Sequence, residues 1–315
     1  MINDELWMDA MRYRSIRGLL TVASIVATLG FVSSPSFGQV TSNVLLRTML
    51  IQASSAEGTA FTIDVDGRQY LITAKHVVAK LQNGTESVIQ VRKKSGWIPL
   101  KVTVLKCDDP LDIAVLVPPS QVTVSFPLEA TSSGMMVGQD AYFVGFPYGE
   151  AFATTFATQP NVFGFVKRAT VAGFQFDESA HAQVILLDGY NNPGFSGSAV
   201  VYRDMNQSGV VFKVAGVLVS YIYDAAPVIN KKQEISESDI TAADRAHDDV
   251  VRTITDGKFY RVEDTKQLVK LNSGIATAWS IDPAIDLIHK HPIGPKVSGS
   301  FSEEESGGDA PYQKK

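Results

Sequence analysis

Short apolar runs recur along the chain from about residue 40 onward, and they are rich in Val, Ile, Thr, Phe and Tyr. Gly, Asn, Asp and Pro separate these runs at a spacing that is typical of short strands joined by turns. The pattern predicts an all-β chain, either a barrel or a sandwich. The predicted strands are Thr59–Val65, Gln69–Ala74, Ser87–Arg92, Leu100–Lys106, Ile113–Val117, Ala141–Phe146, Gly164–Ala172, Gln183–Leu187, Ala199–Tyr202 and Val210–Tyr223.

Turn and helix signals complete this picture. Asp66 and Gly67 stand between two predicted strands and favour a tight hairpin turn. Asp64 and Asp66 also match the start of a calcium-binding loop, but the later ligands of such a loop are missing, so we interpret the segment as a turn. Helices are predicted over Ser238–Thr253, which begins with Ser-Asp and has an apolar face, and over Pro283–His289.

The first 38 residues are organised like a secretory signal. Three arginines precede the uncharged apolar run Gly18–Val32, and the small residues Ser36 and Gly38 follow it. We expect cleavage after Gly38 and an exported protein, periplasmic or secreted, with no stable membrane span afterwards. An uncleaved anchor is the alternative, although about 15 apolar residues fall short of the ~20 that a membrane span requires.

Composition excludes several classes of function. The chain has 315 residues and a formal net charge of −5, so no cationic surface indicates binding to nucleic acid or to an anionic membrane. Cys107 is the single cysteine, which excludes an intrachain disulfide framework and a cysteine-rich zinc module, and we interpret it as a small core residue. His289 and His291 have no third ligand nearby, so we expect solvent exposure rather than a zinc site. No metal or organic cofactor is expected.

Three segments carry residues that can do chemistry. His76 follows a predicted strand, and Asp112 begins an apolar strand, where burial of a carboxylate is costly without a partner. Ser196 lies in Asn192-Pro-Gly-Phe-Ser-Gly-Ser198, whose glycines allow main-chain N–H groups to turn toward one point. Each segment alone has an ordinary explanation: a structural histidine, an aspartate at a strand end, or a Gly-Ser turn.

Together these segments resemble the trypsin-like (chymotrypsin-fold) serine peptidases. The resemblance is to the disulfide-free bacterial branch, which includes the protease domain of the high-temperature-requirement proteases. The matching segments are Thr73-Ala-Lys-His-Val-Val78, Leu111-Asp-Ile-Ala-Val-Leu116, and Asp188 with Asn192-Pro-Gly-Phe-Ser-Gly197. The order His, Asp, Ser also argues against an α/β-hydrolase, which has Ser before Asp before His. The resemblance covers roughly residues 45–290.

The resemblance implies a fold of two packed six-stranded antiparallel β-barrels, with a short helical insertion and a C-terminal helix. Residues 1–38 would be the signal peptide, 39–295 the peptidase domain and 296–315 a disordered tail. Within the peptidase domain we expect the first barrel at about 45–128, the second at about 135–292, and the insertion at about 224–272.

The resemblance also implies roles for the site residues. Ser196 would be the nucleophile, His76 the base that takes its proton, and Asp112 the carboxylate that orients the imidazole. The N–H groups of Gly194 and Ser196 would form the oxyanion hole. The aspartates at 108 and 109 compete for the carboxylate role, and we prefer Asp112 because it directly enters the apolar strand.

The specificity pocket is implied in the same way. Gly189–Asn191, Ser220–Ile222 and Gly274–Ala276 should line it, and Tyr190, Ser220, Tyr221 and Gly274 are the candidate substrate-binding residues. These segments carry no charge, which favours a small or apolar side chain before the scissile bond. Lys75 is expected to face solvent, on the side of the strand opposite to its neighbours. Phe195 replaces the acidic residue that clamps a freed amino terminus in digestive relatives, so we expect no activation switch of that kind.

The sequence thus favours an exported serine endopeptidase that acts on peptides or proteins through a Ser-His-Asp triad and an acyl-enzyme. The alternative is a protease-fold binding or scaffold protein of the cell envelope with an idle triad.

Overall fold

The computed structural model describes residues 40–152, 162–204, 211–246, 250–253 and 255–298. The expected signal peptide (1–38) and most of the expected C-terminal tail lie outside the described residues. None of the helices in the described ranges has the length and apolar character needed to cross a membrane.

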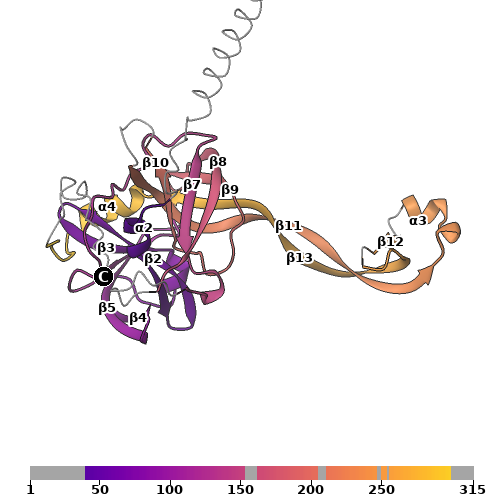
Figure 1. The fold of residues 1–315 in the computed structure, drawn as a ribbon, viewed down its shortest axis with the longest axis horizontal. Coiled ribbons are helices and arrows are strands. Elements are labelled where there is room, and N and C mark those ends of the chain that lie inside the picture. The colour runs from indigo at the N-terminus through magenta and orange to yellow at the C-terminus, as the bar shows by residue number, and fades with distance from the viewer. Residues whose placement is uncertain (1–39, 153–161, 205–210, 247–249, 254, 299–315) are drawn as a thin grey trace, which may run out of the picture. The chain divides into compact units, whose positions relative to one another are not determined.

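The N-terminal half, coloured indigo to purple in Figure 1, forms a closed barrel of antiparallel strands. The order of the strands is β1-β2-β3-β6-β5-β4. A short helix, α2 (Ser42–Leu46), leads into it, and the barrel closes where Ile51 of β1 pairs with Val91 of β4. The strands are β1 (Thr48–Ala53), β2 (Ala56–Val65), β3 (Arg68–Thr73), β4 (Glu86–Lys93), β5 (Gly96–Lys106) and β6 (Ala114–Val117).

The C-terminal half forms a second, ring-like antiparallel sheet. Its order is β11-β10-β7-β8-β9-β13-β12, and an additional pairing between β11 and β13 closes the ring. The strands are β7 (Asp140–Gly145), β8 (Phe165–Asp177), β9 (Ala182–Asp188), β10 (Ala199–Arg203), β11 (Phe212–Ile235), β12 (Val250–Arg252) and β13 (Phe259–Ser280). The predicted all-β architecture of two antiparallel barrels is confirmed, the second as a ring-like sheet.

Short elements between the strands follow the local sequence. Asp66 and Gly67 have φ values of 50° and 70°, the left-handed conformation that a tight two-residue hairpin between β2 and β3 requires. The helix expected over Pro283–His289 is confirmed as α4 (Asp282–Lys290). Two 3-10 turns, η1 (Lys75–Val78) and η2 (Pro147–Gly149), lie beside the candidate site described below.

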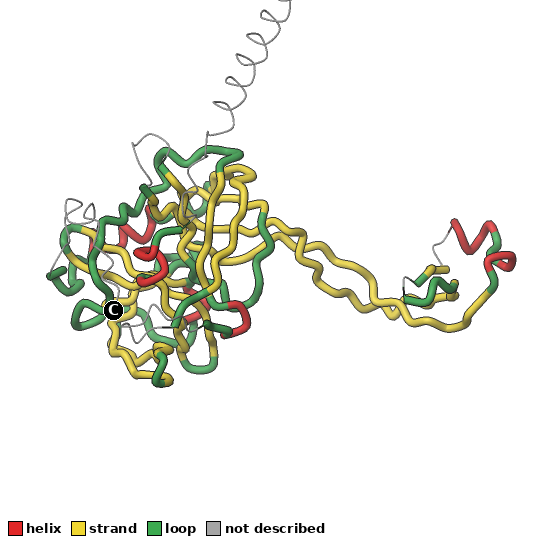
Figure 2. The backbone as a smooth tube through the Cα atoms, viewed as in Figure 1, coloured by secondary structure: helices red, strands yellow, loops and turns green. Residues whose placement is uncertain are grey.

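The insertion expected at about 224–272 is a two-stranded ribbon rather than a helical segment (Figure 2). β11 and β13 continue to pair from Tyr223 and Asn272 as far as Ile235 and Phe259. Of the helix predicted over Ser238–Thr253, the described residues retain only η3 (Glu237–Asp239) and α3 (Ala242–Ala246), and β12 pairs with β13 instead. An amphipathic helix owes most of its stability to packing of its apolar face, and these residues are almost all exposed.

The core consists of three groups of buried side chains. One fills the first barrel and includes Ile51 and Leu71, and another fills the second ring and includes Phe143. The third combines residues from both halves, such as Val115 of β6 and Val144 of β7. Burial of these side chains is the main force that holds the two halves together, since each fully buried Val, Leu or Ile contributes roughly 1.5–3 kcal/mol.

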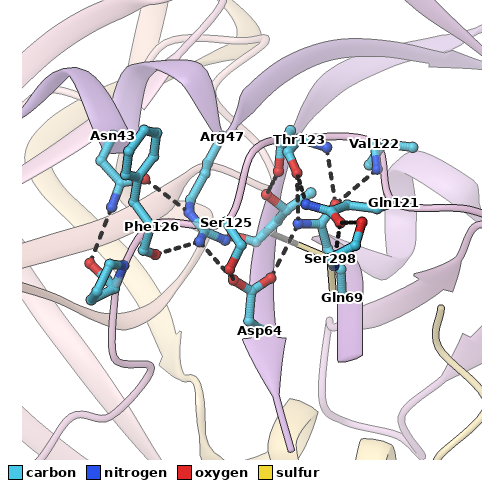
Figure 3. A network of polar contacts seen from close by, with 12 residues as sticks. Asn43, Arg47, Asp64, Gln69, Gln121, Val122, Thr123, Ser125, Phe126 and Ser298 are labelled. Atoms are coloured by element: carbon cyan, nitrogen blue, oxygen red, sulfur yellow. Dashed lines mark hydrogen bonds and ion pairs between the residues drawn. The ribbon is translucent and has the colours of Figure 1, made fainter. Parts of the chain in front are cut away.

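A buried polar network joins the end of α2 and strand β2 to the segment that connects the two halves (Figure 3). Arg47, only 1% exposed, donates to the Asp64 carboxylate at 2.7 Å and to the Phe126 carbonyl at 2.6 Å. Ser125 and Gln69 donate to the same carboxylate. Burial raises the pKa of Asp64, but the hydrogen bonds and charge of Arg47, with the bonds from Ser125 and Gln69, outweigh it and leave the pKa below its ordinary value. Asp64 therefore has the surroundings of an ion-pair residue, in agreement with our interpretation of this segment as a turn.

Candidate active site

His76 lies in η1, directly after β3. Val77 and Val78 are buried in the core of the first barrel and anchor the turn, whereas the side chain of His76 is 48% exposed. The backbone N–H of Lys75 donates to the carbonyl of Asp112 at 3.2 Å, so the turn is also tied to the start of β6. The fold thus presents the imidazole at the surface on a rigid support.

Asp112 contacts His76 through both carboxylate oxygens. Oδ1 accepts the backbone N–H of His76 at 2.8 Å, and Oδ2 lies 2.6 Å from the ring Nδ1. A carboxylate at Nδ1 favours the tautomer that carries its proton there, which leaves Nε2 free to accept a proton. In the described contacts neither Asp108 nor Asp109 reaches His76, and the side chain of Asp109 is 95% exposed.

We expected Lys75 to face solvent, but its side chain is directed toward the protein. Its ammonium donates to the Cys107 carbonyl at 3.0 Å and to the Asp109 carboxylate at 2.7 Å. The expectation assumed that strand alternation continues to residue 75, but the chain has already entered a 3-10 turn there. Lys75 therefore ties the loop that precedes Asp112 to the turn that carries His76.

The Ser196 loop packs against the first barrel beside the same turn. The Ser196 carbonyl accepts the N–H of Thr59 at 2.8 Å. Gly197 has φ 87°, and a Cβ on it would lie 2.1 Å from the Thr59 carbonyl oxygen and 2.9 Å from the nitrogen of Ala74, which is two residues before His76. A glycine is required at 197 because only a residue without Cβ allows this approach.

Two backbone N–H groups of the Ser196 loop take no part in the hydrogen bonds of the described residues. Within the described residues the N–H groups of Gly194 and Ser196 donate to no protein acceptor. Gly194 has φ 97°, and a Cβ there would lie 2.2 Å from the Phe146 carbonyl oxygen. By contrast, every carbonyl from Tyr190 to Ser196 accepts a hydrogen bond. The donors to these seven carbonyls, in chain order of the carbonyls, are Lys167 Nζ, Asn272 Nδ2, Phe195 N, Tyr148 N, Thr59 Oγ1, Ser198 N and Thr59 N.

The three segments expected to line a specificity pocket are in direct contact. Asn191 donates to the Ser220 carbonyl at 3.0 Å, and the N–H of Gly189 donates to the Gly274 carbonyl at 2.8 Å. Tyr221 pairs with Ala276 between β11 and β13. The candidate substrate-binding residues are therefore neighbours, and the side chain of Tyr190 is exposed beside them.

Sequence reasoning missed two residues that shape this site, Thr59 and Lys167. Thr59 is the first residue of a predicted strand, and we predicted no role for it at the site, although its hydroxyl accepts the N–H of Phe146 and donates to the Gly194 carbonyl. Lys167 was predicted only as part of the strand Gly164–Ala172. Both act on segments far away in the sequence, so no local pattern identifies them.

Other groups with possible chemistry lie apart from these residues. Within the described ranges no group of three or more His, Cys, Asp or Glu side chains is placed to hold a metal ion. His289 lies 3.4 Å from Asp66, and both His289 and His291 are exposed. Cys107 is buried, and burial raises the pKa of its thiol to about 11, so it is protonated at neutral pH.

Comparison with known proteins agrees with the fold. Residues 58–212 match the family model of the trypsin-like peptidase domain. Two relatives named serine protease Do-like HtrA, from Lactococcus lactis subsp. cremoris and Lactococcus lactis subsp. lactis, are each 30% identical over 148 residues. These matches cover 47% of this chain but only 34% of each relative, so the chain matches about a third of their length.

Solved structures give weaker similarity. The HtrA-type protease AlgW with a tripeptide has a TM-score of 0.47 at 16% identity, with 79% of this chain and 61% of that chain covered. The inactive form of the Rv3671c protease has a TM-score of 0.43 at 17% identity, with 79% and 90% covered.

Residues 58–212 are therefore similar to a trypsin-like peptidase domain. Within that class, the chain is distantly similar to the HtrA-type serine proteases.

Proposed function

We propose that this protein is a serine endopeptidase in which Ser196, His76 and Asp112 hydrolyse peptide bonds. The observation that carries the proposal is the double contact of the Asp112 carboxylate with His76, at the backbone N–H and at Nδ1. The trypsin-like peptidase match and the two N–H groups of the Ser196 loop that have no protein acceptor support it.

Acylation starts when Nε2 of His76 takes the proton of the Ser196 hydroxyl while Oγ bonds to the carbonyl carbon of the substrate. The N–H groups of Gly194 and Ser196 stabilise the negative oxygen that forms, and each such donor lowers the barrier by about 3–4 kcal/mol. His76 then gives its proton to the leaving amine, the C–N bond breaks, and an acyl-enzyme remains.

Deacylation repeats these steps with water in place of the amine. His76 takes a proton from water, the hydroxyl oxygen bonds to the acyl carbon, and the ester bond to Ser196 breaks as the proton returns to Oγ. Asp112 stabilises the imidazolium in both halves of the reaction.

The substrates in this proposal are peptides or proteins with a small or apolar side chain before the scissile bond. The uncharged segments around Tyr190, Ser220, Tyr221 and Gly274 support this preference. We also propose that the protein is exported, because residues 1–38 have the sequence of a secretory signal. An N-terminus at Gln39 in the protein isolated from its natural host would agree with this, whereas retention of residues 1–38 would indicate an anchor.

Labelling with a fluorophosphonate probe tests the proposal. The folded 315-residue chain should be labelled, and Ser196→Ala should abolish labelling because the nucleophilic oxygen is gone. Ser198→Ala is a matched control, since this neighbouring hydroxyl is buried without a hydrogen-bond partner in the described residues. Labelling that persists in Ser196→Ala would place the nucleophile elsewhere. A well-folded wild type that is not labelled would favour the alternative, a protease-fold binding or scaffold protein.

A further inference from the structure

Lys167 of β8 reaches the loop that carries Ser196 from the side of the second sheet. Its ammonium donates to the Tyr190 carbonyl at 2.5 Å and to the side-chain oxygen of Asn192. The same nitrogen lies 5.5 Å from the centre of the Tyr190 ring and 5.2 Å from that of Phe195. One cation thus contacts three residues of the loop.

These contacts suit a lysine better than a neutral side chain. Two oxygen acceptors and two aromatic faces surround the ammonium, and each is attracted by positive charge. Phe195 is fully buried and packs edge-on against Phe143 at 5.2 Å, so one of the two aromatic faces is fixed in the core. Lys167 is partly buried, and this burial lowers the pKa of its ammonium.

The remaining ties of the loop come from other parts of the fold. Thr59 of β2 holds the carbonyls of Gly194 and Ser196, and the N–H of Tyr148 holds that of Pro193. Lys167 holds the opposite end of the same turn, at Tyr190 and Asn192. Asn191, at the same end, is held by hydrogen bonds with Asn272 and Ser220, but among the described contacts of this end only those of Lys167 carry a charge. Without the ammonium, the side-chain oxygen of Asn192 would lose its charged donor two residues before Gly194, and glycine does not restrict its own rotation.

We infer that Lys167 is a positioning residue, whose ammonium keeps the 190–196 loop in the conformation that presents the Gly194 N–H to the oxyanion. The inference rests on the proposed function. It assigns Lys167 no contact with substrate: the side chain acts through Tyr190, Asn192 and Phe195.

Saturable fluorophosphonate labelling of the full chain tests this inference, because it separates the maximal labelling rate from the half-saturating probe concentration. Lys167→Met keeps the approximate length of the side chain but removes its charge. We expect its maximal rate to fall about tenfold or more, below the ~10²–10³-fold cost of losing a complete oxyanion donor. The half-saturating concentration should change less than about twofold, since only transition-state stabilisation is lost.

Two further variants distinguish positioning from simple structural support. Lys167→Arg retains the charge and several donors and should keep the maximal rate within about threefold of wild type. Lys101→Met, at an exposed position of β5, should behave as wild type. Equal labelling of Lys167→Met and wild type, or equal loss in the Met and Arg variants, would overturn the inference.

If Lys167→Met does not fold, Asn192→Leu takes its place, because it removes one acceptor and leaves the lysine. Its maximal rate should also fall, and an unchanged rate would overturn the inference. Failure of the proposed function looks different, because the wild type itself would then not be labelled.

Discussion

At the scale of single residues, Asp112 fixes His76 through two donors of different kinds. The bond from the backbone N–H fixes the carboxylate relative to η1, and the bond at Nδ1 then fixes the ring relative to the carboxylate. An amide at position 112 could keep the first bond but would present an N–H to Nδ1. The ring would then carry its proton on Nε2, where it cannot accept one from Ser196.

Asp112→Asn should therefore reduce turnover by about 10⁴ with little loss of stability. The initial rate of cleavage of a peptide that the wild type hydrolyses measures the effect. Asp109→Asn is the control and should stay within about threefold, because the exposed ion pair with Lys75 contributes little. If Asp112→Asn were fully active and Asp109→Asn were not, the orienting role would belong to Asp109.

At the scale of elements, the Arg47–Asp64 network joins α2 and β2 to the connection between the two halves. Arg47 is buried, so a neutral residue at 64 would leave its charge without its main partner. We expect Asp64→Asn to lower the free energy of unfolding at pH 7 by about 3 kcal/mol. Asp140→Asn, which breaks the exposed pair with Arg168, should cost less than about 1 kcal/mol. Urea unfolding measures both, and equal losses would contradict this account.

The same network predicts a dependence on pH. The pKa of Asp64 is lower in the folded chain than its ordinary value, so its contribution is fully present above the unfolded pKa of about 3.9 and is lost as pH falls through the folded pKa. The difference in unfolding free energy between wild type and Asp64→Asn should therefore shrink between pH 5 and pH 2. A difference that stays constant over that range would show that Asp64 does not titrate with folding.

Sequence patterns predicted most strands but missed some, and the reasons are physical. β2 and β3 are rich in β-branched and aromatic residues on either side of the Asp66-Gly67 turn, and their predicted bounds agree within three residues for β2 and one residue for β3. β1 was missed because Thr48–Ala53 is buried along nearly its whole length and contains Met, Leu and Gln, so only its pairing with β2 and β4 makes it a strand. The outer part of β13 has no buried face, and the sequence carries no alternation for it.

The residues of the candidate site were likewise predicted only in part. The sequence and its family resemblance singled out His76, Asp112 and Ser196, and the structure brings the first two into contact and packs the Ser196 loop beside them. The contacts of Thr59 and Lys167 join segments that lie far apart along the chain. Such contacts depend on the packing of the two halves and leave no local signal.

At the scale of the whole molecule, the ribbon of β11 and β13 stands apart from the core. None of its described residues between Asp224 and Leu271 belongs to the buried groups that fill the barrels. Replacing residues 226–269 by Asn-Gly should therefore change the free energy of unfolding by less than about 1 kcal/mol, and it shortens a long connection. Fluorophosphonate labelling should persist in this variant. Loss of cooperative unfolding would show that the ribbon is part of the folding unit.

The proposed function requires Ser196 to be the nucleophile. Mass-spectrometric mapping of the probe-labelled wild-type chain tests it most directly, because it identifies the modified side chain without any substitution. We expect one adduct, on Ser196. An adduct on another residue, such as Ser198, or a folded chain without any adduct would contradict it.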